Sequence, residues 1–192
     1  METYFISTLL VGLAEMGDRT QLLAVILACR YRKPIPILLG ILVATLANHG
    51  LAALVGFYLS SLLSAPAFKY AIAASFIAMA VWALIPDKED EGGKPDRLGH
   101  MGVFMATAVC FFLVEMGDKT QIATAALAAR YHQVLWVAAG ATTGMMLANI
   151  PAVFLGDAVT RVLPINLLRY AAAAVYLVLG IWGLAATAGW IH

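Results

Sequence analysis

The chain has 192 residues, of which 62% are apolar and only 12% are charged, and its formal net charge is +1. A soluble domain usually carries about 25% charged residues, so a lipid bilayer must solvate part of this chain. The small net charge argues against nucleic-acid binding, which needs a basic stripe. Cys29 and Cys110 lie in apolar stretches without a CxxC partner, so we expect small buried residues and neither a disulfide nor a zinc site.

Six segments are long and apolar enough to cross a membrane, since a spanning helix needs roughly 20 mostly apolar residues. In chain order they cover about 5–29, 35–60, 68–86, 101–129, 134–160 and 168–190. The polar, acidic linker 87–100 divides the chain nearly in half, and we expect it to be a solvent loop. The predicted fold class is therefore an all-α integral membrane protein with six transmembrane helices.

The two halves of the chain are copies of each other, offset by 100 residues. Residues 13–31 match residues 113–131 with eleven of nineteen positions identical. Further glycine, tyrosine and tryptophan positions recur at the same offset: Gly40 and Gly140, Gly56 and Gly156, Tyr70 and Tyr170, Trp82 and Trp182. An odd number of helices per half makes the second half enter from the opposite side, as in the inverted repeats of many transporters. We predict a first three-helix repeat at 1–86, a loop at 87–100 and a second, inverted repeat at 101–192.

The orientation is predicted from the Lys and Arg content of the short loops, which is higher on the cytoplasmic side. With the N-terminus outside, the cytoplasmic loops carry eight such residues: Arg30, Arg32, Lys33, Lys88, Lys94, Arg97, Arg161 and Arg169. The outer side then carries two, Lys69 and Arg130. Both termini should be periplasmic and the 87–100 loop cytoplasmic. The N-terminus has no basic n-region and no plausible cleavage site, so we expect no signal peptide.

Four acidic residues fall near the centres of two predicted spans: Glu15 and Asp18 in the first, Glu115 and Asp118 in the fourth. A charged residue at the centre of a spanning helix costs roughly 2.5–3.5 kcal/mol on insertion scales. Such residues face the protein interior or a water-filled cavity, and they mark ion or proton pathways. We therefore expect the four carboxylates to share a polar interior.

The spacing within each copy suggests one polar face on a continuous helix. Residues three and four apart are neighbours on a helix, so Arg19 and Lys119 should balance the charge of the acidic residues beside them. Gly17 and Gly117 would allow a close approach of another backbone, or a bend. The polar stripe continues for one more turn in both copies, with Gln21 and Gln121 as candidate metal ligands and Thr20 and Thr120 as supporting residues.

A second polar layer is predicted on the second and fifth segments. Asn48 and Asn149 lie near their centres, as ligands or as helix–helix hydrogen-bond partners. Pro151 should break the fifth helix and free a carbonyl near Leu147, and broken helices with exposed carbonyls coordinate cations in transporters. His49 is either structural or a proton relay, and we see no counterpart for it in the second half.

The charge balance predicts both the cargo and its counter-ion. Four carboxylates and two basic residues leave a charge of −2, which one divalent cation neutralises. The candidate ligands are oxygens, which suit Mg²⁺, Ca²⁺ and Mn²⁺. Crowded carboxylates repel each other, so some should hold protons when no metal is bound, and the cluster should titrate as one unit. Proton coupling is therefore assigned to the same four acidic residues.

The strings EMGDRT at 15–20 and EMGDKT at 115–120 resemble the signature of a known family. The chain is similar to the cation–proton antiporters that include MneA-type bacterial manganese exporters and Golgi and chloroplast manganese or calcium transporters. Their signature is a duplicated Glu-x-Gly-Asp-(Lys/Arg)-(Thr/Ser), and the resemblance covers essentially the whole chain. It implies export of Mn²⁺, or of Ca²⁺ in some members, in exchange for protons, with the acidic residues of both motifs as the site. Within this family, the short N-terminus suits a bacterial member in the inner (cell) membrane.

The sequence alone leaves more than one function open. Oxygen ligands do not separate a Mn²⁺/H⁺ antiporter from a Ca²⁺/H⁺ antiporter. An intramembrane lipid-pyrophosphate phosphatase would need a phosphate cradle that the motifs lack, so we expect no enzyme and no cofactor, with the metal as transported substrate. A passive channel would also use buried acidic residues. Purely structural ion pairs between the halves would not explain why the whole string occurs in both halves.

Overall fold

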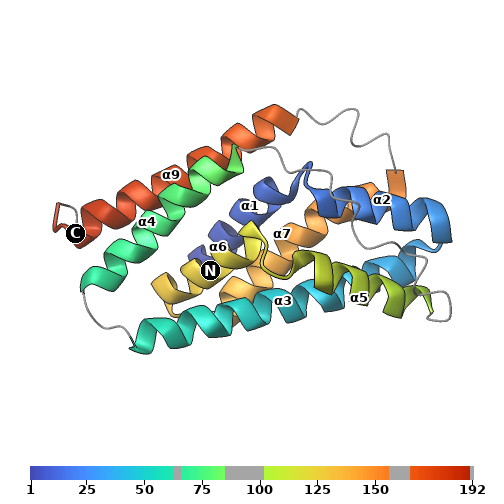
Figure 1. Ribbon diagram of the computed structural model, residues 1–192, viewed down its shortest axis with the longest axis horizontal. Helices are drawn as coiled ribbons and strands as arrows, with labels where there is room; N and C mark the ends of the chain where they lie inside the picture. The colour runs from blue at the N-terminus through green and yellow to red at the C-terminus, as the bar shows by residue number, and fades with distance from the viewer. Residues whose placement is uncertain (63–65, 85–101, 156–164, 191–192) are drawn as a thin grey trace.

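The computed structural model describes residues 1–62, 66–84, 102–155 and 165–190 (Figure 1). These residues are almost entirely helical, with eight helices in chain order: α1 (Glu2–Glu15), α2 (Arg19–Tyr31), α3 (Pro34–Leu62), α4 (Pro66–Ala83), α5 (Val103–Glu115), α6 (Lys119–Tyr131), α7 (Val134–Leu155) and α9 (Ile165–Thr187). Among the described residues, three helical stretches are long and apolar enough to cross a membrane: Pro34–Ser60, Val134–Leu155 and Tyr170–Thr187. The chain is thus an all-helical protein with membrane-spanning character, as predicted. The 87–100 loop lies outside the described residues.

The sequence duplication is also a duplication of local structure. In each half, two short helices are followed by a long helix, and the turn before the long helix has the same geometry. Arg32 and His132 adopt the left-handed conformation, with φ of 52° and 54°. Each donates its backbone N–H at 2.9 Å to the carbonyl four residues earlier, of Ala28 and Ala128 respectively. This is a common way to satisfy the free carbonyls of a helix end.

The first predicted span of each half is interrupted at its acidic motif. The helix α1 ends at Glu15, Asp18 caps the start of α2, and Gly17 between them has a φ of +78°. The second half repeats this arrangement, with a φ of +81° at Gly117. Glycine adopts such angles at no steric cost. The prediction that Glu, Asp and the basic residue share one face of a continuous helix is therefore wrong, since Glu ends one helix and Asp begins the next.

The predicted break at Pro151 is not found. Helix α7 continues through this proline to Leu155. Proline removes one backbone hydrogen bond, but the chain on either side can stay helical with a kink when tertiary contacts hold it there. The interruptions that expose backbone at the level of the acidic residues are those at Gly17 and Gly117.

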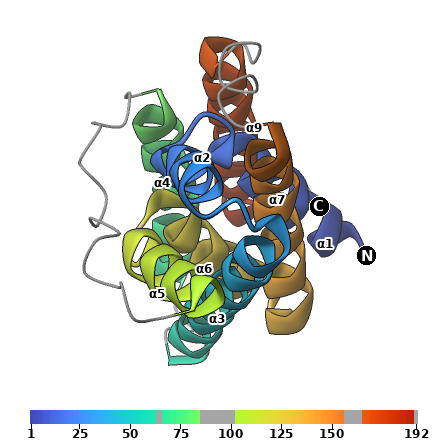
Figure 2. The same cartoon turned by 90° about the vertical axis from the view of Figure 1, so that its right-hand side faces the viewer.

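The two halves exchange contacts in a reciprocal way. Helix α1 packs on α7, and α5 packs on α3, so each first half-helix lies on the long helix of the other half (Figure 2). A Cβ atom at Gly40 would lie 2.8 Å from the Cβ of Thr107, and one at Gly140 would lie 2.9 Å from the Cβ of Ser7. Thr107 and Ser7 are themselves equivalent under the 100-residue offset. Glycine at both crossings lets the backbones approach closely, as at helix contacts in membranes.

Helices α4 and α9 break this symmetry. They pack along each other (Figure 1), and they also contact α6 and α1, whereas the equivalent pairs α9–α2 and α4–α5 lack comparable packing within the described residues. Burial follows the same asymmetry: Ile26 of α2 is 52% exposed, while its equivalent Ala126 of α6 is 8% exposed. The α4–α9 pair therefore leans toward one side of an otherwise two-fold core.

Candidate cation site

Three of the four predicted acidic residues meet in the protein interior. Glu15 ends α1, Glu115 ends α5 and Asp118 caps α6, and each can place a carboxylate oxygen within 4.8 Å of the other two. Their exposed fractions are only 0%, 1% and 5%, respectively. One carboxylate comes from the first half and two come from the second. The cluster therefore depends on the crossing of the two halves, and its oxygens could bind one divalent cation.

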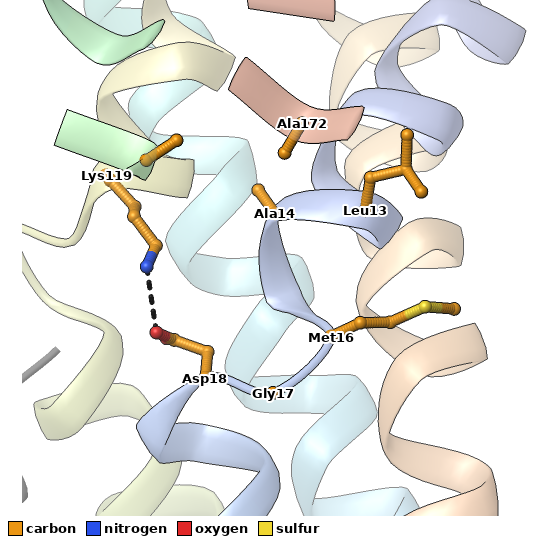
Figure 3. Close-up of a pocket in the computed structure, with 8 residues that line it drawn as sticks. Leu13, Ala14, Met16, Gly17, Asp18, Lys119 and Ala172 are labelled. Atoms are coloured by element: carbon orange, nitrogen blue, oxygen red, sulfur yellow. Dashed lines mark hydrogen bonds and ion pairs between the residues drawn. The ribbon is translucent and has the colours of Figure 1, made fainter. Parts of the chain in front are cut away.

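The fourth acidic residue, Asp18, makes an ion pair with the basic residue of the other half. The Nζ atom of Lys119 lies 2.9 Å from Oδ1 of Asp18, and both side chains are nearly inaccessible (Figure 3). Lys119 thus balances an acid of the opposite motif and not only the acids beside it in sequence. The side chain of Arg19, its equivalent, lies outside the described residues.

A small pocket lies beside this ion pair, with a volume of about 10 Å³. That is close to the space that one water molecule needs. The lining residues come from α1 and its break, from α4, from α6 and from α9 (Figure 3): Leu13, Ala14, Met16, Gly17, Asp18, Ala83, Lys119 and Ala172. One residue of α4 and one of α9 therefore line the pocket beside the interruption between α1 and α2.

The two motif threonines contact carboxylates, and both threonines are fully buried. The hydroxyl of Thr20 donates to Oε1 of Glu15. The hydroxyl of Thr120 instead lies 3.2 Å from Oδ2 of Asp118 and donates to it. The same residue type therefore supports the glutamate in one half and the aspartate in the other.

The two motif glutamines hold the breaks in place. Oε1 of Gln21 accepts the backbone N–H of Gly17 at 2.9 Å, and its Nε2 donates to the carbonyl of Ala148 on α7 at 2.9 Å. Gln121 repeats both contacts with Gly117 at 2.7 Å and with the carbonyl of Asn48 on α3 at 3.4 Å. Each amide therefore ties an interrupted helix to the long helix of the other half.

These contacts also correct the pairing of the long-helix residues. Because the carbonyls of Asn48 and Ala148 accept equivalent hydrogen bonds, the counterpart of His49 is Asn149. The second half thus has an asparagine, and not a second histidine, at the position of His49. The Nδ2 atom of Asn48 donates to the carbonyl of Phe112 on α5 at 3.2 Å, which is a helix–helix bond.

The remaining two polar groups of this layer have unused atoms. The Nδ1 atom of His49 lies 3.0 Å from Oγ1 of Thr124, while its Nε2 is buried without a hydrogen-bond partner among the described residues. The Nδ2 atom of Asn149 donates to the carbonyl of Met145 at 3.0 Å, while its Oδ1 is buried and likewise accepts no hydrogen bond from the described part of the chain. Asn149 thus keeps an oxygen that could take a ligand.

Sequence reasoning did not single out Tyr176, and it misjudged one cysteine. Tyr176 of α9 is fully buried among apolar residues, and its hydroxyl has no hydrogen-bond partner among the described residues. The available signal was a difference between the repeats, because the equivalent residue is Phe76. Cys110 is buried as predicted, but Cys29 is exposed.

An all-helical membrane protein with duplicated interrupted helices and a buried carboxylate cluster shared between its halves has the architecture of an ion transporter. The chain matches the family described as divalent cation/proton antiporter GDT1 over residues 3–91 and 103–190, once in each half. It belongs to this family, which confirms the resemblance of the two motifs.

Two curated relatives agree with this assignment. A protein of Vibrio cholerae, named as a candidate manganese exporter, is 46% identical over 182 residues, covering 94% of this chain and 90% of the relative. A GDT1-like protein of Synechocystis is 31% identical over 167 residues, covering 77% of this chain and 80% of the relative. No solved structure matches the chain.

Proposed function

We propose that this protein is a secondary active transporter that exports Mn²⁺ from the cytoplasm in exchange for protons. The observation that carries the proposal is the buried meeting of Glu15, Glu115 and Asp118, whose oxygens lie within 4.8 Å of one another. Three carboxylates at this separation in a poorly hydrated interior repel each other strongly unless a cation or protons neutralise them. Family membership and the name of the Vibrio relative both support a divalent metal as the cargo.

The proposed ligands are the oxygens of this cluster together with the unused Oδ1 of Asn149. Asp18 belongs to the same polar interior, and its ion pair with Lys119 neutralises its charge. The other amides of the predicted ligand set, Gln21, Gln121 and Asn48, hold the interrupted helices in position. We therefore assign these three amides an orienting role.

Proton exchange follows from the charge of the cluster. A divalent cation neutralises two of three carboxylates, and the third needs a proton or a basic neighbour. When the metal leaves, protons must replace most of its charge, so metal and protons compete for the same oxygens. A cycle that moves only the metal-loaded or the protonated site couples inward protons to outward Mn²⁺.

The membrane arrangement is part of the proposal. Two interrupted helices that cross through reciprocal contacts support inverted repeats at 1–86 and 101–192, with six spans in total. We place both termini in the periplasm, the 87–100 loop in the cytoplasm and the chain in the bacterial inner membrane. Helices α4 and α9 contact α6 and α1, and they pack less on the equivalent helices α2 and α5. Alternating access needs an asymmetry of this kind, in which the two repeats of one protein take different conformations.

The test is transport by the purified protein in proteoliposomes and by everted vesicles. Adding Mn²⁺ to energised everted vesicles should raise their internal pH, apparent affinity should fall as pH drops, and a protonophore should stop accumulation. Accumulation that persists after the proton gradient has collapsed would refute antiport. A parallel series with Ca²⁺ and Mg²⁺ decides the cargo, since Mg²⁺ dehydrates reluctantly and demands near-ideal octahedral geometry. Preference for Ca²⁺ would replace manganese with calcium as the cargo.

Glu15→Gln and Glu115→Gln test the shared site within the same assays. Each removes one charge from the cluster with little change in shape, so each should abolish transport. Glu2→Gln is the matched control, because Glu2 is an exposed glutamate in the first turn of the same helix as Glu15. Full export by both cluster variants would show that the acidic residues do not form one site.

A further inference from the structure

The guanidinium of Arg130 lies over the indole ring of Trp182, and the proposed mechanism does not use this contact. Arg130 stands in the last turn of α6 and Trp182 near the end of α9, and the Cζ atom of the arginine lies 4.4 Å from the ring centroid. A Cβ atom at Gly183 would lie only 2.9 Å from Nη1 of Arg130, so glycine at this position leaves room for the guanidinium. Tryptophan is the aromatic residue that attracts a cation most strongly. The contact therefore ties α9 to the end of α6.

The other end of the α4–α9 pair covers the interruption between α1 and α2, which we call the first interruption. A Cβ atom at Gly183 would lie 3.1 Å from the Cβ of Ala73, so the end of α9 touches the early part of α4. Ala83 at the end of α4 and Ala172 in the early part of α9 both line the pocket beside the first interruption (Figure 3). The two helices are therefore antiparallel. The contact with Arg130 and the pocket lie at opposite ends of the pair.

The two interruptions differ in exposure. Met16 and Gly17 are half-buried, whereas Met116 and Gly117, in the interruption between α5 and α6, are exposed. The exposed fraction of Met116 is 55%. The same Glu-Met-Gly-Asp string surrounds both glycines, so the local sequence does not explain the difference. The helix pair that lies against the first interruption and not against the second explains it.

The first half of the chain contains an equivalent arginine and tryptophan. Arg30 stands in the last turn of α2 and Trp82 near the end of α4, at the same 100-residue offset as the other repeated residues. In both halves the arginine also lies 5.7 Å from the ring centroid of the tyrosine that follows it. The residue after the tryptophan differs, because Ala83 stands where the second half has Gly183. A stack in the first half would therefore have less room for the guanidinium.

We propose that the stack of Arg130 on Trp182 is a latch that holds α4 and α9 over the first interruption. A stack of Arg30 on Trp82 replaces it when the helix pair moves to the second interruption. This inference rests on the proposed function, because alternating access moves one part of an inverted repeat against the other. A contact that only one of two states makes shifts the equilibrium toward that state. Because Ala83 crowds the second stack, the state with the Arg130 latch is favoured.

The experiment measures which interruption water can reach, in purified protein in lipid nanodiscs. One thiol is introduced by Met16→Cys or by Met116→Cys. The native thiols are removed from both proteins by Cys29→Ser and Cys110→Ala. The rate of reaction with a water-soluble maleimide then reports how often each interruption is uncovered, whether or not the protein transports metal under the same conditions.

The two tryptophans should have opposite effects on the thiol at position 16. In Trp182→Leu this thiol should react roughly two- to fivefold faster, because the loss of one partly exposed cation–π contact changes an equilibrium by about that factor. In Trp82→Leu it should react more slowly by a similar factor, since the opposite state has lost its latch. Arg130→Gln should act like Trp182→Leu, and Arg130→Lys should have a smaller effect because it keeps the cation.

Trp136→Leu is the matched control. Trp136 of α7 is 48% exposed, close to the 42% of Trp182, and its ring packs edge-on against Tyr4. This substitution should leave both labelling rates unchanged. An equal effect of Trp136→Leu and Trp182→Leu would overturn the latch, as would an unchanged rate in Trp182→Leu.

Shifts in the same direction by Trp182→Leu and Trp82→Leu would also overturn it, because both indoles would then act as membrane anchors. Failure of the proposed function has a separate readout. It would appear as absence of Mn²⁺ transport by the unaltered protein in proteoliposomes, whereas failure of the latch appears in the labelling rates.

Discussion

The ion pair between Lys119 and Asp18 provides the sharpest test of the site, because it joins the two halves at the level of the carboxylate cluster. Replacing Lys119 by Met keeps most of the apolar stem and removes the charge. The carboxylate of Asp18 then keeps its burial and loses its partner at 2.9 Å. We expect a large loss of stability at neutral pH.

The magnitude follows from the geometry. Two unit charges 2.9 Å apart attract by about 6 kcal/mol at an effective dielectric constant of about 20. Removing one partner of a buried pair typically costs about 3–5 kcal/mol, because the remaining charge stays buried. We therefore expect Lys119→Met to lower the free energy of unfolding by about 3–5 kcal/mol.

The assay is unfolding of the purified protein in mixed micelles, read by circular dichroism. Lys119→Arg is the conservative control, because arginine stands at the equivalent position 19 and keeps the charge. The double variant with Asp18→Asn should recover much of the stability, because no unpaired charge remains. A double-mutant cycle then isolates the energy of the pair from the packing of the two side chains.

The reasoning would be refuted if Lys119→Met and Lys119→Arg unfolded alike. It would also be refuted if adding Asp18→Asn to Lys119→Met caused a further loss, since the two residues would then act independently. The double variant should still fail to transport Mn²⁺, because its polar interior has lost a carboxylate.

Three further predictions test the interrupted helices and the membrane topology. Gly117→Ala should destabilise the protein by roughly 1–2 kcal/mol, because the positive φ at this position strains any residue with a Cβ. Gly50→Ala is the control and should be neutral or stabilising, because Gly50 lies inside α3 with open space around it. Equal unfolding temperatures of the two variants would contradict a left-handed turn at Gly117. Gln21→Ala removes two hydrogen bonds of about 1 kcal/mol each and should lower both stability and transport. Normal transport by this variant would show that the hydrogen bond from Gln21 to α7 is not needed for function. Gly92→Cys, in the acidic loop, should react with an impermeant maleimide only from the cytoplasmic side, and labelling of intact cells would reverse the proposed topology.

The membrane class, the duplication and the acidic residues of the site could be predicted from the sequence because they depend on local composition. A shortage of charged residues excludes a fully solvated surface, whatever the fold is. Identity between 13–31 and 113–131 indicates equivalent structures in both halves. Carboxylates inside apolar segments are so costly that they must converge on a polar interior. Glu15, Glu115 and Asp118 do converge in this way.

The arrangement within the site was decided by the tertiary structure. Glycine is compatible with a helix interior, a bend or a left-handed turn, so Gly17 and Gly117 did not reveal that the helices stop there. Counting three residues from Glu15 to Asp18 then gave a shared helix face that does not exist, since the two residues belong to different helices. The helix expected to break at Pro151 instead remained continuous.

Partners between the halves depend on how the helices cross, and no local pattern encodes a crossing. Lys119 pairs with Asp18, which is 101 residues away, although Asp118 is its neighbour in sequence. Gln21 and Gln121 bind carbonyls of the opposite long helices, those of Ala148 and Asn48 respectively. The sequence by itself thus determined which residues form the polar interior. The tertiary structure decided that Glu15, Glu115 and Asp118 gather and that Asp18 pairs with a lysine. The distances between these side chains are set only when the two halves pack together.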